Sequence, residues 1–235
     1  MTSPATGPLR LLVVEDEALY REMLATCLAG EPAFTVVGAF ENGDQAVGEA
    51  ERLNPAVAIL DFELPGSMHG IDLGLALRRA RPGLGVVLLS NHAVPQLLST
   101  LPAEAVSGWS YLVKRSVADL ASLKQAILAA AAGSVAIDAT LVRAMRPRGG
   151  SPIEALTPEQ REVLQLVAEG YSDAAIAALL GRDEIGVAAT VAQIYDALAI
   201  DRHDRAVQPR VRAVLMYLQQ TRLRGPVPRD LPSAS

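Results

Sequence analysis

Five polar side chains in the first half of the chain are of types that could together handle a phosphoryl group, and each directly follows a short apolar run. Three are carboxylates, which repel one another when crowded unless a cation neutralises them, and magnesium prefers such oxygen ligands. A carboxylate beside a bound cation can attack a phosphoryl group, while a hydroxyl and an ammonium hold the transferred oxygens. The five are Glu15 and Asp16 (after Leu9–Val14), Asp61 (after Ala56–Leu60), Ser90 (after Gly85–Leu89) and Lys114 (after Tyr111–Val113).

The apolar runs have at most six residues and are too short to be helices. They indicate strands that are buried on both faces. A further run of this kind is Thr35–Ala39. Five β-α units in succession predict a parallel sheet with right-handed crossovers, and ligands bind such sheets at the carboxyl ends of the strands. The amphipathic stretches predicted to be the covering helices are Ala18–Ala29, Gly43–Leu53, Ile71–Ala80, Val94–Leu101 and Val117–Ala132.

Any one of these polar residues could be an ordinary helix cap or loop acid on an α/β fold. Five of them at the ends of four strands favour a phosphoryl-binding pocket, because clustered titratable groups mark functional sites.

Residues 9–133 resemble the receiver domain of two-component response regulators, which implies a flavodoxin-like, five-stranded parallel sheet. Four motifs match in the same order along the chain. They are Val13-Val-Glu-Asp-Glu17, Ile59-Leu-Asp-Phe-Glu-Leu-Pro-Gly66, Leu88-Leu-Ser90 and Tyr111-Leu-Val-Lys114.

The resemblance implies that Asp61 accepts phosphate from a sensor histidine kinase. It also implies a Mg2+ site formed by Glu15, Asp16, Asp61 and the main-chain carbonyl of Glu63. Such a domain is not an enzyme beyond accepting the phosphoryl group and slowly losing it by autodephosphorylation.

The resemblance further implies that Ser90 and Tyr111 form the pair that moves on phosphorylation, while Lys114 contacts the phosphoryl group. Prolines at positions 95 and 102 predict a short, irregular fourth helix.

The pattern changes after the first 133 residues. The chain is predicted to divide into a receiver at 8–133, a linker at 134–154, a helical domain at 155–223 and a disordered tail at 224–235. The linker is indicated by Arg146-Pro-Arg-Gly-Gly-Ser-Pro152, which has no apolar period. Thr157-Pro-Glu-Gln160 is a capping box that starts the first of four predicted helices. The four are predicted to span 157–169, Ser172–Leu180, Ile185–Leu198 and Ala206–Leu223.

Residues 156–218 resemble the helix-turn-helix effector of NarL/LuxR-type regulators, a small all-α domain. The resemblance rests on Leu156-Thr-Pro-Glu-Gln-Arg-Glu-Val-Leu-Gln-Leu-Val-Ala-Glu-Gly170 and Ile176-Ala-Ala-Leu-Leu180. Such a bundle presents its third helix to the major groove of DNA.

The charge of this domain departs from that of a typical DNA reader. Residues 156–218 hold six arginines and nine acids, a net charge of 6 − 9 = −3. No Lys or Arg lies between Arg182 and Arg202, the stretch that holds the whole third helix. Because phosphate neutralisation supplies much of the affinity for DNA, binding is predicted to be weak.

Three interpretations of the third helix remain open. The preferred one is a transcription regulator that binds DNA. A helix-turn-helix domain without DNA affinity that binds a protein partner is the alternative, and the third is that the polar residues are plain solvated surface. The residues predicted to contact DNA are Arg182, Thr190, Gln193, Arg202 and Arg205.

The composition of the 235 residues indicates a cytoplasmic protein, and the resemblance to response regulators implies that it acts as a homodimer. Hydrophobic residues make up 50% of the chain and the formal net charge is −5. No apolar run approaches the ~20 residues of a membrane span, and the N-terminus lacks the pattern of a secretory signal. The one cysteine, Cys27, excludes an intramolecular disulfide and is predicted to be a core residue.

Overall fold

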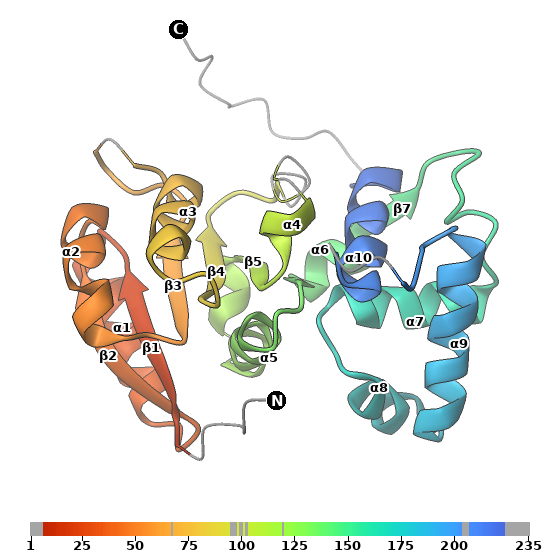
Figure 1. The fold of residues 1–235 in the computed structure, drawn as a ribbon, viewed down its shortest axis with the longest axis horizontal. Helices are drawn as coiled ribbons and strands as arrows, with labels where there is room; N and C mark the ends of the chain where they lie inside the picture. The colour runs from red at the N-terminus through yellow and green to blue at the C-terminus, as the bar shows by residue number, and fades with distance from the viewer. Residues whose placement is uncertain are drawn as a thin grey trace, which may run out of the picture.

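The chain folds into an α/β part followed by a mainly helical part (Figure 1). The computed structural model describes residues 7–66, 68–94, 98, 101, 103–118, 120–203 and 207–223. Its first part is a parallel sheet in the order β2-β1-β3-β4-β5-β6. Within the described residues, no helix has the length and apolar character needed to cross a membrane.

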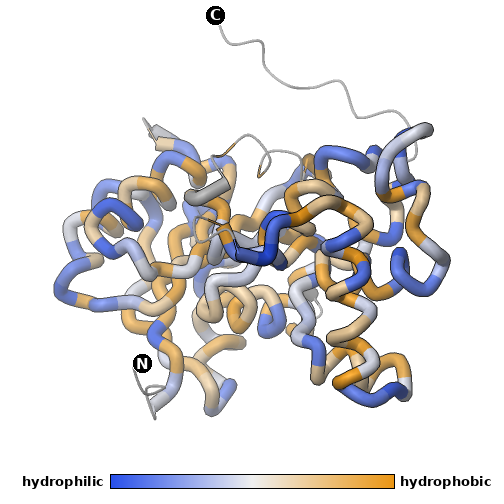
Figure 2. The backbone as a smooth tube through the Cα atoms, turned by 45° about the vertical axis from the view of Figure 1, so that its right-hand side comes forward, coloured by the Kyte–Doolittle hydropathy of each residue, from blue (hydrophilic) through white to orange (hydrophobic). Residues whose placement is uncertain are grey.

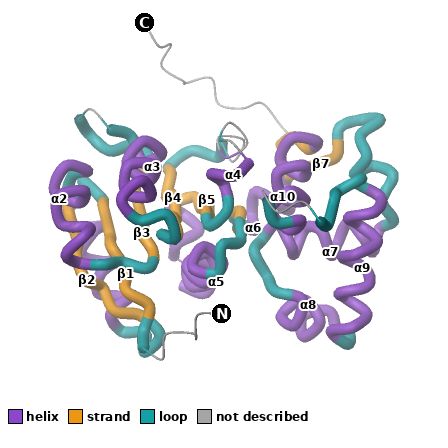
Figure 3. Tube along the Cα trace, viewed as in Figure 1, coloured by secondary structure: helices purple, strands orange, loops and turns teal. Residues whose placement is uncertain are grey.

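The five predicted strands are present and form five of the six strands of the sheet, with β2 at one edge (Figure 3). The residues of β3, β4 and β5 are all buried, as their unbroken apolar sequences predict. In Figure 2, hydrophobic segments of the backbone, coloured orange, run through this part of the molecule. The strands are β1 (Leu9–Val14), β2 (Phe34–Phe40), β3 (Val57–Asp61), β4 (Gly85–Ser90) and β5 (Trp109–Val113).

Helices cover both faces of the sheet. Leu24 and Leu28 of α1 pack in one apolar cluster with Ile127 of α5, while Ala46 of α2 and Leu73 of α3 belong to the cluster on the other face. The helices of this part are α1 (Ala18–Ala29), α2 (Gly43–Leu53), α3 (Gly70–Ala80), α4 (Ala103–Val106), the 3-10 helix η2 (Lys114–Ala118) and α5 (Leu120–Ala131).

Two predictions for this part differ from the structure. The helix α4 has only four residues and begins after the predicted stretch Val94–Leu101, of which 95–97, 99 and 100 lie outside the described residues. Cys27 is exposed rather than core, because the buried stripe of α1 runs through Leu24 and Leu28 and turns Cys27 outward.

The segment 134–154, predicted to be a linker, contains three short elements. They are β6 (Ala136–Ile137), α6 (Ala139–Ala144) and β7 (Met145–Pro147). The strand β6 pairs with β5 and makes the sheet six-stranded rather than five-stranded. A strand of two residues is too short to show a hydrophobic period, so the sequence did not predict it. In the structure, hydrogen bonds hold it in place.

Asp138 supplies several of those hydrogen bonds. Its side chain is buried and accepts from the backbone N–H of Val113 at 3.0 Å and from Thr140 at 2.8 Å. Its own N–H donates to the carbonyl of Tyr111 at 2.8 Å. This residue therefore joins the end of β5 to the first turn of α6.

The helical part begins as its capping residues predict. Thr157 and Gln160 form the predicted capping box, while Ser172 and Asp183 cap the next two helices. The last predicted helix ends earlier, and its final three residues form β8 (Thr221–Leu223), which pairs antiparallel with β7. The helices are α7 (Pro158–Ala168), α8 (Asp173–Leu180), α9 (Glu184–Ala197) and α10 (Pro209–Gln220).

The two parts are packed against each other. Gly170 has a φ of +88°, and a Cβ there would lie 2.5 Å from the Cβ of Ala136, so only glycine fits this contact. The side-chain amide of Gln125 in α5 donates to the carbonyl of Gly170 at 2.7 Å, and the Tyr217 hydroxyl in α10 donates to the carbonyl of Val142 at 2.9 Å. The tail at 224–235 lies outside the described residues.

Candidate functional site

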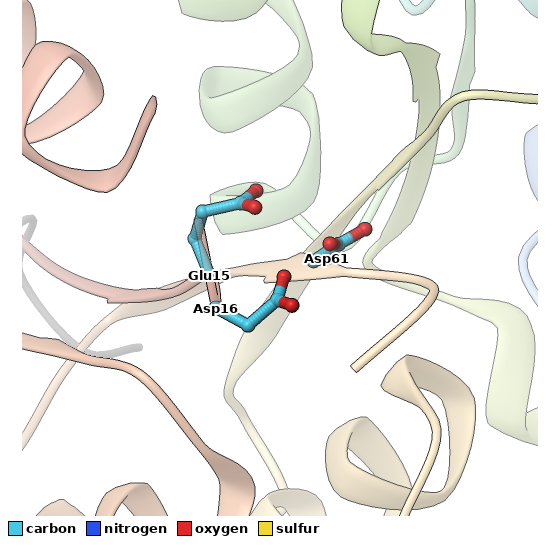
Figure 4. Close-up of side chains that lie close together, drawn as sticks. All are labelled: Glu15, Asp16 and Asp61. Carbon is cyan, nitrogen blue, oxygen red and sulfur yellow. The ribbon is translucent and has the colours of Figure 1, made fainter. Parts of the chain in front are cut away.

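Three carboxylates meet at the carboxyl edge of the sheet, as the sequence predicts. Glu15 and Asp16 follow β1, and Asp61 ends the neighbouring strand β3, so the parallel pairing of Val14 with Leu60 brings them together (Figure 4). One oxygen of each lies within 4.8 Å of the others. Glu15 and Asp61 are buried, whereas Asp16 is exposed, which leaves the cluster open to solvent on one side.

Lys114 completes this cluster from the end of β5. Its Nζ lies 2.9 Å from Glu15 Oε1 and 2.9 Å from Asp61 Oδ2. Burial alone would lower the pKa of Lys114, but the hydrogen bonds that it donates to Glu15 and Asp61 outweigh burial and raise the pKa above its ordinary value. The ammonium is therefore held charged beside Asp61.

The environment of Glu15 fits a bound divalent cation. Burial raises its pKa from 4.5 to about 7, against the opposing hydrogen bond from Lys114, and the charge of Asp61 raises it further. Its Oε2 is buried without a hydrogen-bond partner. An unpartnered buried carboxylate oxygen is costly, and a cation coordinated by Glu15, Asp16 and Asp61 would remove that cost.

Ser90 and Tyr111 lie near this pocket on adjacent strands. Ser90 Oγ accepts from the N–H of His92 at 3.0 Å. The Tyr111 hydroxyl donates to the carbonyl of His92 and accepts from the N–H of Val94 at 3.1 Å. Burial raises the pKa of Tyr111, opposed by its hydrogen bond with Ser90. Tyr111 thus points inward and ties β5 to the loop after β4.

Sequence reasoning missed a second group at the mouth of the pocket. The N–H of Glu63 donates to Asp61 Oδ1 at 3.1 Å. The Glu63 carboxylate lies 3.1 Å from His92 Nε2 and accepts from Asn91 Nδ2 at 3.1 Å. The signal was available, because both partners directly follow Ser90 at the same edge of the sheet.

Tyr20 and Arg21, on the first turn of α1, were also missed. The ammonium of Lys114 sits 5.0 Å from the centre of the Tyr20 ring, within the range of a cation–π contact. Arg21 Nη1 donates to the carbonyl of Glu15 at 2.6 Å and so fixes the backbone that carries the first carboxylate. Both lie one helical turn beyond Glu15 and Asp16.

The predicted DNA-contacting residues are less well placed. Gln193 is exposed on α9. Arg182 forms an ion pair with Glu159 at 2.5 Å, and Arg202 forms one with Asp196. Arg205 lies outside the described residues.

Thr190 does not lie on the exposed face of α9, contrary to the prediction. It is 8% exposed, and its hydroxyl donates to the carbonyl of Gly186 at 3.0 Å within the helix. It belongs to the buried stripe with Val187, Val191 and Ile194, at spacings of three and four residues.

The comparisons with known proteins agree with this geometry. The family model described as "Response regulator receiver domain" matches residues 11–128. The chain is 29% identical over 220 residues to the probable transcriptional regulatory protein NarL of Mycobacterium tuberculosis (strain ATCC 25618 / H37Rv), which covers 92% of this chain and 100% of that protein. It is 29% identical over 223 residues to the nitrate/nitrite response regulator protein NarP of Escherichia coli K12, which covers 92% and 98%.

Among solved structures, one of the RcsB response regulator of Salmonella typhimurium is 23% identical, with a TM-score of 0.49, and covers 91% of this chain and 99% of that one. The receiver match spans half of the chain and includes all five predicted pocket residues. The chain therefore belongs to the response regulator receiver family.

Proposed function

We propose that this chain is a response regulator that is phosphorylated on Asp61 by a sensor histidine kinase and that controls transcription through its helix-turn-helix domain. The observation that carries the proposal is the position of the Lys114 ammonium, 2.9 Å from Asp61 Oδ2 inside a cluster of three carboxylates. A cation beside a buried nucleophilic carboxylate is the arrangement that phosphoryl transfer requires.

In the proposed reaction, a carboxylate oxygen of Asp61 attacks the phosphorus of a phosphohistidine. The new O–P bond forms an acyl phosphate while the N–P bond breaks, and the histidine nitrogen leaves with the electron pair. Mg2+ held by Glu15, Asp16, Asp61 and the carbonyl of Glu63 would supply charge neutralisation when bound. Lys114 would release Asp61 and hold a phosphoryl oxygen instead.

The proposed output is a population shift of the loop that follows β4. Ser90 Oγ accepts from the N–H of His92 and also shares a hydrogen bond with the Tyr111 hydroxyl, and a phosphoryl group on Asp61 would offer the Ser90 O–H a stronger acceptor than Tyr111. Tyr111 holds the same loop through His92 and Val94, so a change there reaches β5. The surface altered in this way would then favour a homodimer.

DNA binding is proposed from the helical fold and from the similarity to regulators named for transcription. The outward face of α9 offers Gln193, a side chain able to pair with adenine. The arginines flanking α9 are already paired with acids, so little phosphate neutralisation comes from this helix. The comparisons lend no support to the protein-partner alternative.

The test is DNA binding by the full chain with and without a small phosphodonor and Mg2+. Fluorescence anisotropy with duplex DNA at low salt should show tighter binding after phosphorylation, and Asp61→Asn should remove that difference. Phosphorylation without any DNA binding, even at the lowest salt, would overturn the transcription role and favour a protein partner. Absence of phosphate on Asp61 would overturn the receiver role.

A further inference from the structure

The small sheet β7–β8 carries two arginines side by side on its outer face. Met145 and Thr221 are buried, and the alternation of side chains along a strand turns Arg146 and Arg222 outward. These two are direct cross-strand partners. Like charges placed opposite each other destabilise a sheet, so this pair is unfavourable for the chain alone.

Two more exposed arginines lie beside this pair. Arg143, at the end of α6, has a side chain that is 72% exposed, and Arg148 follows β7. We call Arg143, Arg146, Arg148 and Arg222 the arginine face. The segments 143–154 and 221–223 together hold these four arginines and one acid, Glu154, a net charge of 4 − 1 = +3.

The arginine face holds more cations than ion-paired acids, although Glu162 lines the same cavity as Arg143 and Arg146. In the described part of the chain, Arg146, Arg148 and Arg222 take part in no ion pair within 4.0 Å, and Arg143 reaches Glu169 only at 3.8 Å. The Glu154 carboxylate accepts from the N–H of Gly150 at 2.6 Å. Glu159 is occupied by Arg182.

We propose that the arginine face binds the phosphate backbone of duplex DNA and supplies most of the phosphate neutralisation that α9 lacks. This inference rests on the proposed function. Guanidinium groups pair with phosphates in a fork geometry, and a bound phosphate would relieve the repulsion between Arg146 and Arg222. The helix-turn-helix domain as a whole has a net negative charge. The arginine face is therefore the surface whose positive charge is complementary to the DNA backbone.

The arrangement separates two tasks that one helix often combines. The β7 strand lies at the end of the helical part opposite α8, so the arginine face and the α8–α9 turn are distinct surfaces (Figure 1). Phosphate contacts made at β7–β8 would fix the position of the protein on the duplex. The uncharged outer side chains of α9 would then only need to distinguish base edges.

The experiment compares two double variants of the full, phosphorylated chain by anisotropy with a labelled random-sequence duplex over a range of salt. Arg146→Gln with Arg222→Gln removes the cross-strand pair. Arg52→Gln with Arg79→Gln removes the same charge from exposed positions of the receiver and is the matched control. Thermal unfolding of each variant checks the fold, because the first variant loses a like-charge pair but also the hydrogen bonds that Arg146 Nη1 donates to the carbonyls of Arg143 and Met145.

We expect the sheet variant to bind roughly tenfold more weakly at low salt and to lose about 1.8 from the slope of log affinity against log salt, since each contact contributes about 0.9. The control should keep both values. An unchanged slope in the sheet variant, with the loss found instead in Arg182→Gln with Arg202→Gln, would overturn this inference but leave DNA binding intact. Failure of the unmodified chain to bind duplex at any salt would overturn both.

Discussion

The receiver pocket and the outer face of α9 handle charge in opposite ways. In the pocket, three carboxylates are crowded around one ammonium, and a buried oxygen of Glu15 is left without a partner. Around α9, Arg182 and Arg202 are each neutralised by a neighbouring acid, and the helix itself has no cation. Charged groups that lack partners indicate a site where a ligand of opposite charge binds. The pocket therefore indicates a cation as its ligand, whereas the residues of α9 indicate none.

The largest expected effect concerns the nucleophile of the pocket. Asp61→Asn should abolish phosphorylation by a small phosphodonor, because the amide cannot form the acyl phosphate. Mass spectrometry of the intact chain measures the added phosphate directly. Asp44→Asn, at an exposed position in the first turn of α2, should be phosphorylated normally. Equal phosphorylation of both variants would place the acceptor outside the pocket.

The second prediction tests whether the crowded carboxylates destabilise the chain without a cation. Because the folded-state pKa of Glu15 is raised to about 7 from 4.5, its contribution to stability is full below pH 4.5 and is lost as the pH rises through 7. In metal-free buffer this loss should approach about 3 kcal/mol, and Glu15→Gln should remove it.

Urea unfolding at pH 5 and pH 8, with a chelator and with Mg2+, measures this effect. Mg2+ should stabilise the unmodified chain at pH 8 and have little effect on Glu15→Gln. Glu22→Gln, on the exposed side of α1, serves as the control and should behave like the unmodified chain. The idea fails if the unmodified chain and Glu15→Gln lose stability in parallel between the two pH values.

The third prediction would make α9 resemble the pocket by giving it unpaired charge. Ala188 and Ala197 are exposed on α9, so Ala188→Lys with Ala197→Lys should strengthen binding to random duplex DNA. The salt slope should steepen by up to about 1.8. Ala29→Lys with Ala80→Lys adds the same charge to exposed receiver positions and should have a smaller effect. Equal gains in both variants would show that α9 does not face the duplex.

The smallest effect separates the buried and exposed sides of α9. Thr190→Val should leave DNA binding unchanged and cost about 1 kcal/mol of stability or less, since one internal hydrogen bond is lost. Gln193→Ala should leave stability unchanged and alter base preference. Competition between duplexes of different sequence, together with urea unfolding, measures both. A change in base preference caused by Thr190→Val would contradict the placement of its side chain.

Much of the receiver could be predicted because its signals are local and repeated. The bounds of β1, α1 and α2 follow from runs of apolar residues and from the caps at their ends, and they agree with the structure residue by residue. The pocket followed from the strand ends, since the carboxyl edge of a parallel sheet collects whatever residues stand there. The contacts of Glu63, Tyr20 and Arg21 were not predicted, although all three residues stand close in the sequence to the predicted pocket residues.

The remaining elements could not be predicted because they depend on distant partners. The strands β6, β7 and β8 have two or three residues each, too few to show a period of two, and β7 pairs with residues more than 70 positions away. Thr190 is different, because its burial could have been predicted. Its spacing from Val187 and Ile194 matches the apolar stripe of a helix, and the error came from assigning a role by residue type alone.

The sixth strand has a consequence for where the chain can be cut. A receiver fragment that stops at Gly133 would lack β6 and would leave β5 as the open edge of the sheet, with the carbonyl of Tyr111 and the N–H of Val113 unpaired. Exposed edge strands invite pairing with other chains, so such a fragment should self-associate. A fragment that continues through Ala144 keeps the Asp138 hydrogen bonds and a protected edge. The domain boundary predicted from the apolar pattern, at Gly133, thus differs from the boundary at Ala144 that should give a monomeric fragment.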